Sequence, residues 1–423
     1  MLSEEVIDKV VERLVNRIEQ GNEYILKTIG ESIKKVGTLS PSKAQELSQI
    51  IKYGGDYEKI VKRLAEITKL NVKDIYAIFE QVAKSDYQFS KQFYKYRNKK
   101  FIPYEKNLEL KNQVEALARI TAQEYINITN TLAFSKVVNG RTVYTPLARM
   151  YQEVLDTAVL NVAQGKETFQ SEMYRVLKEL GESGIRTVDY PSSRSIRLDS
   201  AIRMQMRTAL RTLHNENQKI IGEDFGSNMV EVSHHSNSAP DHIDTVDGKQ
   251  FARIDVIKRQ IKSGEEKEIK LSDIKGNKVK VKGKWYYDFD YINNNLVRHV
   301  SMLNCYHYTF EGILGISKPA FTEEELQKDK ETNLNGFEYE NKHYTMYEGE
   351  QLLRKIELEI RKAKDEQILG RSSGIIENIE DAQNRITILT HKYKDILKAS
   401  ELPSKLERAR VVGYHRVSTK KLK

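Results

Sequence analysis

The chain has 423 residues, of which 39% are hydrophobic, and its 69 basic and 60 acidic residues give a formal net charge of +9. This length predicts about two to three domains. No membrane-spanning helix is predicted, because the sequence has no run of about 18 apolar residues. The acidic, amphipathic N-terminus is unlike a signal peptide, and a single cysteine excludes an internal disulfide framework. The small basic excess permits a polyanionic partner without requiring one.

Residues 1–100 are predicted to form a helical N-terminal subdomain, because apolar residues recur at helical spacing. Interruptions predict about five short helices, with breaks at Gly21, Gly30, Ser40-Pro41 and Gly54-Gly55. The end of this region interleaves aromatic rings with cations, a pattern that can stack bases and hold phosphates. The alternative is an amphipathic helix, which is favoured by the helical spacing of Phe89, Phe93 and Tyr96.

Residues 101–222 are predicted to form a helical region. Its periodic stretches predict helices at about Tyr104–Phe134, Thr145–Gln164, Glu167–Leu180 and Asp199–Lys219. Glycines at 181 and 184 are expected to end the third of these helices.

Three arginines, Arg203, Arg207 and Arg211, lie four residues apart on the last of these helices. Guanidinium groups aligned on consecutive turns can bind phosphate or an acidic protein surface. The alternative is a solvated face on which Asp199 pairs with Arg203.

Residues 223–320 are predicted to form a small central α+β module. The segment MVEVSHH and the alternating segment KVKVK have the period of strands, and turns are expected at residues 275–277 and 282–283. The lysines of this hairpin, Lys278, Lys280 and Lys282, could protect an exposed sheet edge from aggregation or contact DNA.

Residues 321–423 are predicted to form C-terminal helices and a basic tail. Thr322 followed by Glu325 predicts a helix start, and two later helices, at about Tyr347–Asp365 and Ile375–Ala399, are expected to pair as a hairpin. A mobile tail from residue 405 is expected to contact DNA through Lys405, Arg408, Arg410, Lys420, Lys421 and Lys423. The whole chain is therefore predicted to be mainly α, with helical ends flanking the central module.

The chemistry of the chain is concentrated in the central module. Imidazole, thiolate and carboxylate ligands suit zinc, and the candidates are His234, His235, Asp241, His242, Asp244, Cys305 and His307. The alternative to a structural zinc ion is a polar cluster that also includes Asn304 and locks the loops by hydrogen bonds. A metal-dependent nuclease with His242 as base and Asn304 and His307 as metal ligands, or a nucleophilic Cys305, are further alternatives.

Four segments in this order resemble the phage minor capsid protein 2 group, which is related to the Mu F-like head-morphogenesis proteins of tailed bacteriophages. They are VDYPSSRSIRLDSAIRMQMRTAL, VEVSHHSNSAPDHIDTVDGKQF, NCYHYTFEGILGIS and YEGEQLLRKIELEIRKAK. The resemblance spans about residues 104–413, and residues 1–100 are interpreted as an addition without a counterpart in that group. One difference is Tyr306, which stands where the group commonly has an arginine.

The resemblance implies a structural virion protein that is not an enzyme and has no cofactor. It implies synthesis in the bacterial cytoplasm and a place in the phage head interior or at the portal vertex. The implied partners are the portal protein and the major capsid protein, with non-specific contact to packaged DNA. The implied roles are head assembly and DNA packaging or delivery, against the alternative of a metal-dependent nucleic-acid hydrolase.

Overall fold

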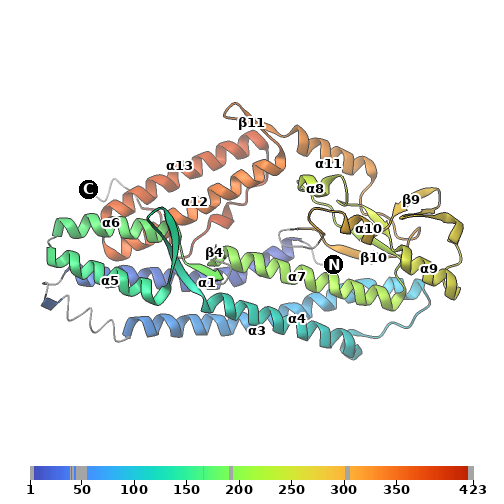
Figure 1. Ribbon diagram of the computed structural model, residues 1–423, viewed down its shortest axis with the longest axis horizontal. Helices are drawn as coiled ribbons and strands as arrows, with labels where there is room; N and C mark the ends of the chain where they lie inside the picture. The colour runs from blue at the N-terminus through green and yellow to red at the C-terminus, as the bar shows by residue number, and fades with distance from the viewer. Residues whose placement is uncertain are drawn as a thin grey trace. The chain divides into compact units, whose positions relative to one another are not determined.

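The computed structural model describes residues 4–38, 40, 42–43, 55–164, 166–189, 194–300 and 305–417 (Figure 1). The chain forms two compact units, and each unit is assembled from three separate stretches of sequence. Unit 1 comprises Met1–Val10, Asp74–Ala122 and Met204–Glu348, and unit 2 comprises Val11–Lys73, Gln123–Arg203 and Gly349–Lys423. Chain order therefore does not separate the two units.

Helices account for most of the described chain. They are α1 (Glu4–Gly37), α3 (Gly55–Tyr96), α4 (Leu108–Asn130), α5 (Leu147–Gln164), α6 (Lys166–Ser183), α7 (Leu198–Phe225), α8 (Pro240–Ile243), α9 (Ile254–Ser263), α10 (Phe289–Asn294), α11 (Glu323–Asn335), α12 (Met346–Ser373) and α13 (Ile376–Ser400). The prediction of a mainly α protein with a small central α+β module is confirmed.

Two three-stranded sheets form the central module within unit 1. Their strands are β5 (Met229–Val232), β6 (Gln250–Ala252) and β10 (Thr309–Gly312) in one sheet, and β7 (Ile274–Lys275), β8 (Lys278–Val281) and β9 (Lys284–Tyr287) in the other. Strand β5 is central in its sheet, pairs antiparallel with β10 and β6, and is buried on both faces. Met229 packs with Val279 and Val281, whereas Val230 and Val232 pack with a different core around Phe251.

A four-stranded antiparallel sheet lies in unit 2, where the sequence predicts only helices. Its order is β2-β1-β3-β4, with β1 (Leu132–Val138), β2 (Arg141–Pro146), β3 (Arg186–Asp189) and β4 (Arg194–Arg197). The helix expected to reach Phe134 ends at Asn130, and a two-residue turn at Asn139-Gly140 joins β1 to β2. Both turn residues have positive φ, at 51° and 74°, the turn geometry in which Asn-Gly is favoured.

The N-terminal region contains long helices where short ones are expected. Gly21 and Gly30 lie inside α1, so their interpretation as helix breaks is wrong. A Cβ atom at Gly30 would lie 2.8 Å from the Cβ atom of Ser372, and one at Gly21 would lie 3.2 Å from Leu64. These glycines therefore permit close packing within unit 2, and a glycine in a helical pattern does not by itself mark a helix end. The expected break at Pro41 lies outside the described residues.

The aromatic and basic residues at the end of α3 form an amphipathic helix, as the favoured interpretation has it, but a different set of rings is buried. Tyr87 and Tyr94 are 1% exposed, whereas Phe89 and Tyr96 are 44% and 52% exposed. The hydroxyl of Tyr94 donates to Asp224 Oδ2 over 2.5 Å, so a polar contact fixes this buried ring in unit 1.

The C-terminal hairpin is present, but residues 405–417 are not a mobile tail. Helices α12 and α13 lie side by side in unit 2 (Figure 1), and Gln367 Nε2 donates to Gln383 Oε1 between them. The chain after α13 folds back on this hairpin, because Ala409 is fully buried and Val417 N donates to Gln383 Oε1. Residues 418–423 lie outside the described residues.

Candidate functional site

The site lies in unit 1, where the ends of β5 and β10 meet. These strands are antiparallel, with Val232 opposite Thr309, so the chain leaving β5 and the chain entering β10 lie at the same edge of the sheet. His234 follows β5, and Cys305 and His307 precede β10. The short helix α8 brings His242 to the same place. This topology explains how side chains about 60 residues apart in the sequence form one cluster.

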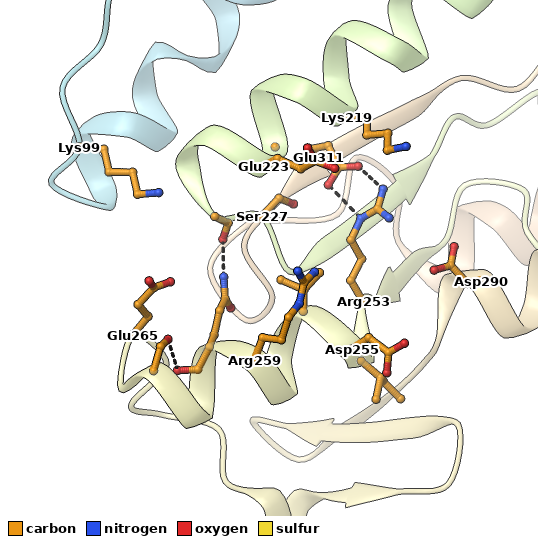
Figure 2. Close-up of a pocket in the computed structure, with 16 residues that line it drawn as sticks. Lys99, Lys219, Glu223, Ser227, Arg253, Asp255, Arg259, Glu265, Asp290 and Glu311 are labelled. Atoms are coloured by element: carbon orange, nitrogen blue, oxygen red, sulfur yellow. Dashed lines mark hydrogen bonds and ion pairs between the residues drawn. The ribbon is translucent and has the colours of Figure 1, made fainter.

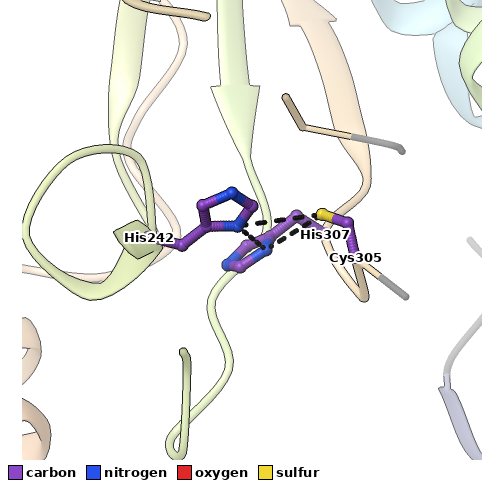
Figure 3. A group of neighbouring side chains, drawn as sticks. All are labelled: His242, Cys305 and His307. Atoms are coloured by element: carbon purple, nitrogen blue, oxygen red, sulfur yellow. Dashed lines mark hydrogen bonds between the residues drawn. The ribbon is translucent and has the colours of Figure 1, made fainter. Parts of the chain in front are cut away.

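Three buried side chains converge in this cluster (Figure 3). Nδ1 of His242 lies 3.2 Å from Nδ1 of His307. The Sγ atom of Cys305 lies 3.8 Å from the first nitrogen and 3.5 Å from the second. His242, Cys305 and His307 are 1%, 2% and 3% exposed. Among the described residues, they are the group whose spacing fits a shared metal ion.

The outer nitrogens of both histidines are held by acceptors. Nε2 of His242 lies 2.6 Å from the carbonyl oxygen of Arg298, and Nε2 of His307 lies 2.8 Å from Oδ1 of Asp247. A carbonyl or carboxylate oxygen can only accept, so each Nε2 carries a proton. The two Nδ1 atoms therefore face each other and the sulfur.

Asp247 organises the polar side of the cluster. In addition to His307, its carboxylate accepts from His234 Nδ1 at 2.6 Å, from Ser238 Oγ at 2.8 Å and from the backbone N–H of His235 at 2.8 Å. Burial acts to raise the pKa of Asp247, but the hydrogen bonds from His234 and His307 hold it well below its usual range. The carboxylate is thus an ionised anchor for two loops.

The electrostatics of Cys305 and His307 favour a thiolate. Burial acts to raise the pKa of the thiol, but hydrogen bonds with His242 and His307 lower it to about 5. Burial acts to lower the pKa of His307, but its hydrogen bonds with Asp247 and Cys305 raise it to about 9. The cluster therefore contains the deprotonated sulfur that a metal ion requires.

Three of the remaining residues of the predicted cluster, His235, Asp241 and Asp244, make contacts outside the group of His242, Cys305 and His307. His235 Nε2 is 2.6 Å from the carbonyl oxygen of Tyr306, and Asp241 forms an ion pair with Arg298. Asp244 forms an ion pair with Lys330, and Asn304 lies outside the described residues.

Two acidic residues of the site were missed by the sequence analysis. Asp247 is followed by Gly248 with φ of +68°, so the Asp-Gly pair signalled a turn but not a carboxylate that anchors a histidine. Asp329 lies on α11, where Oδ2 is 2.7 Å from His234 Nε2. The hydrogen bond to Asp247, opposed by burial and helped by the hydrogen bond to Asp329, raises the pKa of His234 above its ordinary value.

The predicted arginine stripe is engaged within the chain. Arg203 forms ion pairs with Glu12 and, as the alternative interpretation expects, with Asp199. Arg207 pairs with Asp8. Arg211 is buried, and burial lowers its pKa.

Three cations of the β7–β9 sheet, Lys275, Lys278 and Lys280, lie on one face, on which Lys275 and Lys280 are exposed and Lys278 is partly buried. The strand register places Lys278 opposite Tyr287 and Lys280 opposite Trp285, and these four side chains share a face because alternate residues of a strand point the same way. The opposite face contains Val279, which is fully buried in the core of unit 1. Lys282 lies outside this face and donates to the carbonyl oxygen of Gly315 at 2.7 Å.

The C-terminal cations expected to form a basic tail are part of the fold as far as residue 417. Lys405 pairs with Glu350, and the carbonyl oxygen of Arg408 accepts from Arg361. Arg410 is exposed, whereas Lys420, Lys421 and Lys423 lie outside the described residues.

A pocket of about 810 Å³ opens elsewhere in unit 1, between the end of α7 and helix α9 (Figure 2). Its basic side chains are Lys99, Lys219, Arg253 and Arg259, and its acidic ones are Glu223, Asp255, Glu265, Asp290 and Glu311. Arg253 is already paired with Glu311. Because acids are as prominent as bases, the lining does not define a phosphate site.

A comparison with protein families matches residues 2–398 to the family described as phage minor capsid protein 2. The chain therefore belongs to the phage minor capsid protein 2 family, and it is a structural protein of the phage virion. The match begins at residue 2, so the interpretation of residues 1–100 as an addition without a counterpart is wrong. No curated protein and no solved structure matches the chain. Within the described residues, no helix has the length and apolar character needed to cross a bilayer.

Proposed function

We propose that the protein lies at the portal vertex inside the head of a tailed phage, where it contacts the portal and major capsid proteins and aids head assembly and DNA packaging or delivery. The family match over nearly the whole chain carries this proposal, because a virion protein must contact other virion proteins. The exposed cations of the β7–β9 face support a surface directed toward the genome.

Chemical cross-linking of purified virions, followed by mass spectrometry, tests the position. The expected result is peptides of this protein cross-linked to portal protein, at a low copy number relative to the major capsid protein. Cross-links to the outer surface of the capsid alone, or absence of the protein from particles, would contradict the proposal.

The β7–β9 face is proposed to bind duplex DNA through its phosphates. The Nζ atom of Lys278 lies 4.9 Å from the centre of the Trp285 ring, and those of Lys275 and Lys280 lie 6.0 and 5.9 Å away. The Trp285 ring thus makes cation–π contacts with all three lysines and holds them close together. Such a group attracts phosphates without reading bases, as a protein in contact with a whole genome requires.

The double variant Lys278→Glu/Lys280→Glu is expected to lower affinity for duplex DNA of any sequence on the order of tenfold at low salt. The slope of log affinity against log salt concentration should also become shallower by about one for each phosphate contact that is lost. Filter binding or fluorescence anisotropy over a salt series measures both effects.

The matched control is Lys394→Glu/Lys398→Glu, which makes the same change of charge at exposed positions on α13. An equal loss of affinity in the two double variants would show that net charge alone matters. Unchanged binding in the β8 variant would leave these lysines as solvated surface charges. They do not protect a sheet edge, because β8 is the central strand of the order β7-β8-β9.

A metal-dependent nuclease is the alternative function, and the geometry favours it less. His242 is 1% exposed and its Nε2 is bonded to the Arg298 carbonyl oxygen, so this ring is not placed to activate water beside a phosphodiester. Incubation of the purified protein with DNA and Mg²⁺, Mn²⁺ or Zn²⁺ tests this alternative. Cleavage that is abolished by His242→Ala would overturn the structural assignment.

A further inference from the structure

We propose that His242, Cys305 and His307 bind a zinc ion that fastens together the loops of the central module. This inference does not depend on the proposed position in the virion. It is carried by the distances between the three donor atoms, the orientation of both imidazoles and the burial of all three side chains.

The donor distances match one face of a zinc tetrahedron. Zinc bonds of about 2.3 Å to sulfur and about 2.0–2.1 Å to nitrogen, at tetrahedral angles, place two nitrogens roughly 3.3 Å apart and the sulfur roughly 3.6 Å from each. The observed separations are 3.2 Å for the two Nδ1 atoms and 3.5 and 3.8 Å for sulfur to nitrogen. A single ion can therefore contact all three donors at ordinary bond lengths without rearrangement.

Both histidines are oriented as zinc ligands usually are. Each ring directs Nδ1 into the cluster, while Nε2 donates to the Arg298 carbonyl oxygen in His242 and to the Asp247 carboxylate in His307. A carboxylate or carbonyl behind the ligating imidazole fixes the tautomer and strengthens the ligand. Asp247 is accordingly a positioning residue, because it acts on the site through His307.

The ligand types select the metal. One sulfur and two imidazole nitrogens suit a borderline-soft ion such as Zn²⁺, whereas Mg²⁺ and Ca²⁺ prefer oxygen ligands. The three protein donors leave the fourth vertex for water or another ligand. An open fourth vertex is typical of catalytic zinc sites, but the three side chains here are at most 3% exposed and join α8 to the chain before β10, so we assign the ion a structural role.

The metal content of the full-length protein, purified without chelator and measured by inductively coupled plasma mass spectrometry, is the first test. We expect about one zinc per chain in the wild type and a loss of most of it in Cys305→Ser and His242→Ala. His343→Ala is the matched control, because His343 lies in the same unit, is half-exposed and forms an ion pair with Glu338. It should retain the wild-type zinc content.

Because the variants could fail to fold, a second measurement uses the wild-type chain alone. The apoprotein, with its fold verified by circular dichroism, is titrated with Co²⁺, which reports tetrahedral coordination and sulfur ligation by its absorption. Cys305 is the single cysteine of the chain, so a sulfur-to-cobalt charge-transfer band can come only from this site. Zn²⁺ should displace the cobalt and protect Cys305 from alkylation.

A folded wild-type protein that contains no metal, gives no sulfur-to-cobalt band and is alkylated equally with and without Zn²⁺ would overturn the proposal. In that case the proton on Nδ1 of His307 occupies the centre of the cluster, and the three residues are a hydrogen-bonded lock.

Discussion

Replacing Arg197 by methionine is expected to lower the free energy of unfolding of unit 2 by about 3–5 kcal/mol. The Arg197 side chain is 4% exposed, and its Nη2 donates to Asp365 Oδ2 at 2.9 Å while Nε donates to Asp199 Oδ1 at 3.3 Å. Asp365 is fully buried. Methionine removes the positive charge and leaves the Asp365 carboxylate without this partner in a place from which water is excluded, whereas Asp199 keeps its ion pairs with Arg203 and Arg361.

Urea unfolding monitored by circular dichroism measures this effect, with Arg175→Met as the matched control. Arg175 makes an ion pair with Glu172, but its side chain is 74% exposed. Solvent weakens such a pair, so the control should change stability by less than about 1 kcal/mol. Equal effects of the two substitutions would contradict a buried charge network.

The surroundings of Arg197 explain why this network is specific. Gly184, with φ of +58°, ends α6, and a Cβ atom at this position would lie 2.6 Å from the Arg197 Cζ atom. Burial acts to raise the pKa of Asp199, but the charges of Arg361, Arg197 and Arg203 hold it below its usual range. The double variant Arg197→Met/Asp365→Leu should recover much of the lost stability, because it removes both members of a buried pair.

Local signals in the sequence predicted local structure well. The Thr322–Glu325 capping box is present, with Glu325 N donating to Thr322 Oγ1 at 3.2 Å. The apolar seam of α13 is buried at Ile379, Ile386 and Ile396, as its helical spacing predicts. These features depend on residues within a few positions of one another, which a sequence displays directly.

Features that depend on distant contacts were predicted less well. Gly30 resembles a helix break until the proximity of Ser372 is known. The ion pair of Arg203 with Asp199 could be predicted, because the two residues are four positions apart. The second partner of Arg203, Glu12, is 191 positions away and could not be predicted. The hairpin at Asn139-Gly140 was missed for another reason. Its turn signal is local, but the helical pattern before it led to a prediction of helix as far as Phe134.

The three side chains that converge in the candidate site were among those named from the sequence, whereas the residues that hold them in place were not. Histidine and cysteine are rare in this chain, so their types identified His242, Cys305 and His307. Asp247 is one of many acidic residues, and only the fold shows that it accepts from two histidines. The same limit explains why the packed position of residues 405–417 was missed, because their basic composition carries no sign of the α12–α13 hairpin beneath them.

Glu19→Gln is expected to abolish the loss of stability that ionisation of Glu19 causes in the wild-type protein as the pH rises from about 5 to 8. Glu19 lies in unit 2 and is 4% exposed. Burial, reinforced by the charges of Asp199 and Asp365, raises its pKa from the ordinary value of 4.5 to about 8. The folded state therefore retains a proton that the unfolded chain has already released.

The sign of the effect follows from proton binding. Below pH 4.5 both states hold the proton, and the group has no effect on the pH dependence of stability. Between 4.5 and 8 the unfolded chain is ionised while the folded protein is not, so rising pH favours unfolding, and the loss is complete above 8. Glutamine cannot ionise, so the variant lacks this loss, which is on the order of 5 kcal/mol at most.

Urea unfolding of the wild type and of Glu19→Gln at pH 5, 6, 7 and about 8.5 measures the difference, which should grow in favour of the variant through this window. Glu377→Gln, at an exposed position on α13, is the control for removing a surface carboxylate. In the wild type, the charge of Arg197 lowers the pKa of Glu19. Without Arg197 this pKa should be higher, so in an Arg197→Met background the stability difference should continue to grow at higher pH. Parallel stability curves for the wild type and Glu19→Gln would show that Glu19 is ionised in the folded protein at neutral pH.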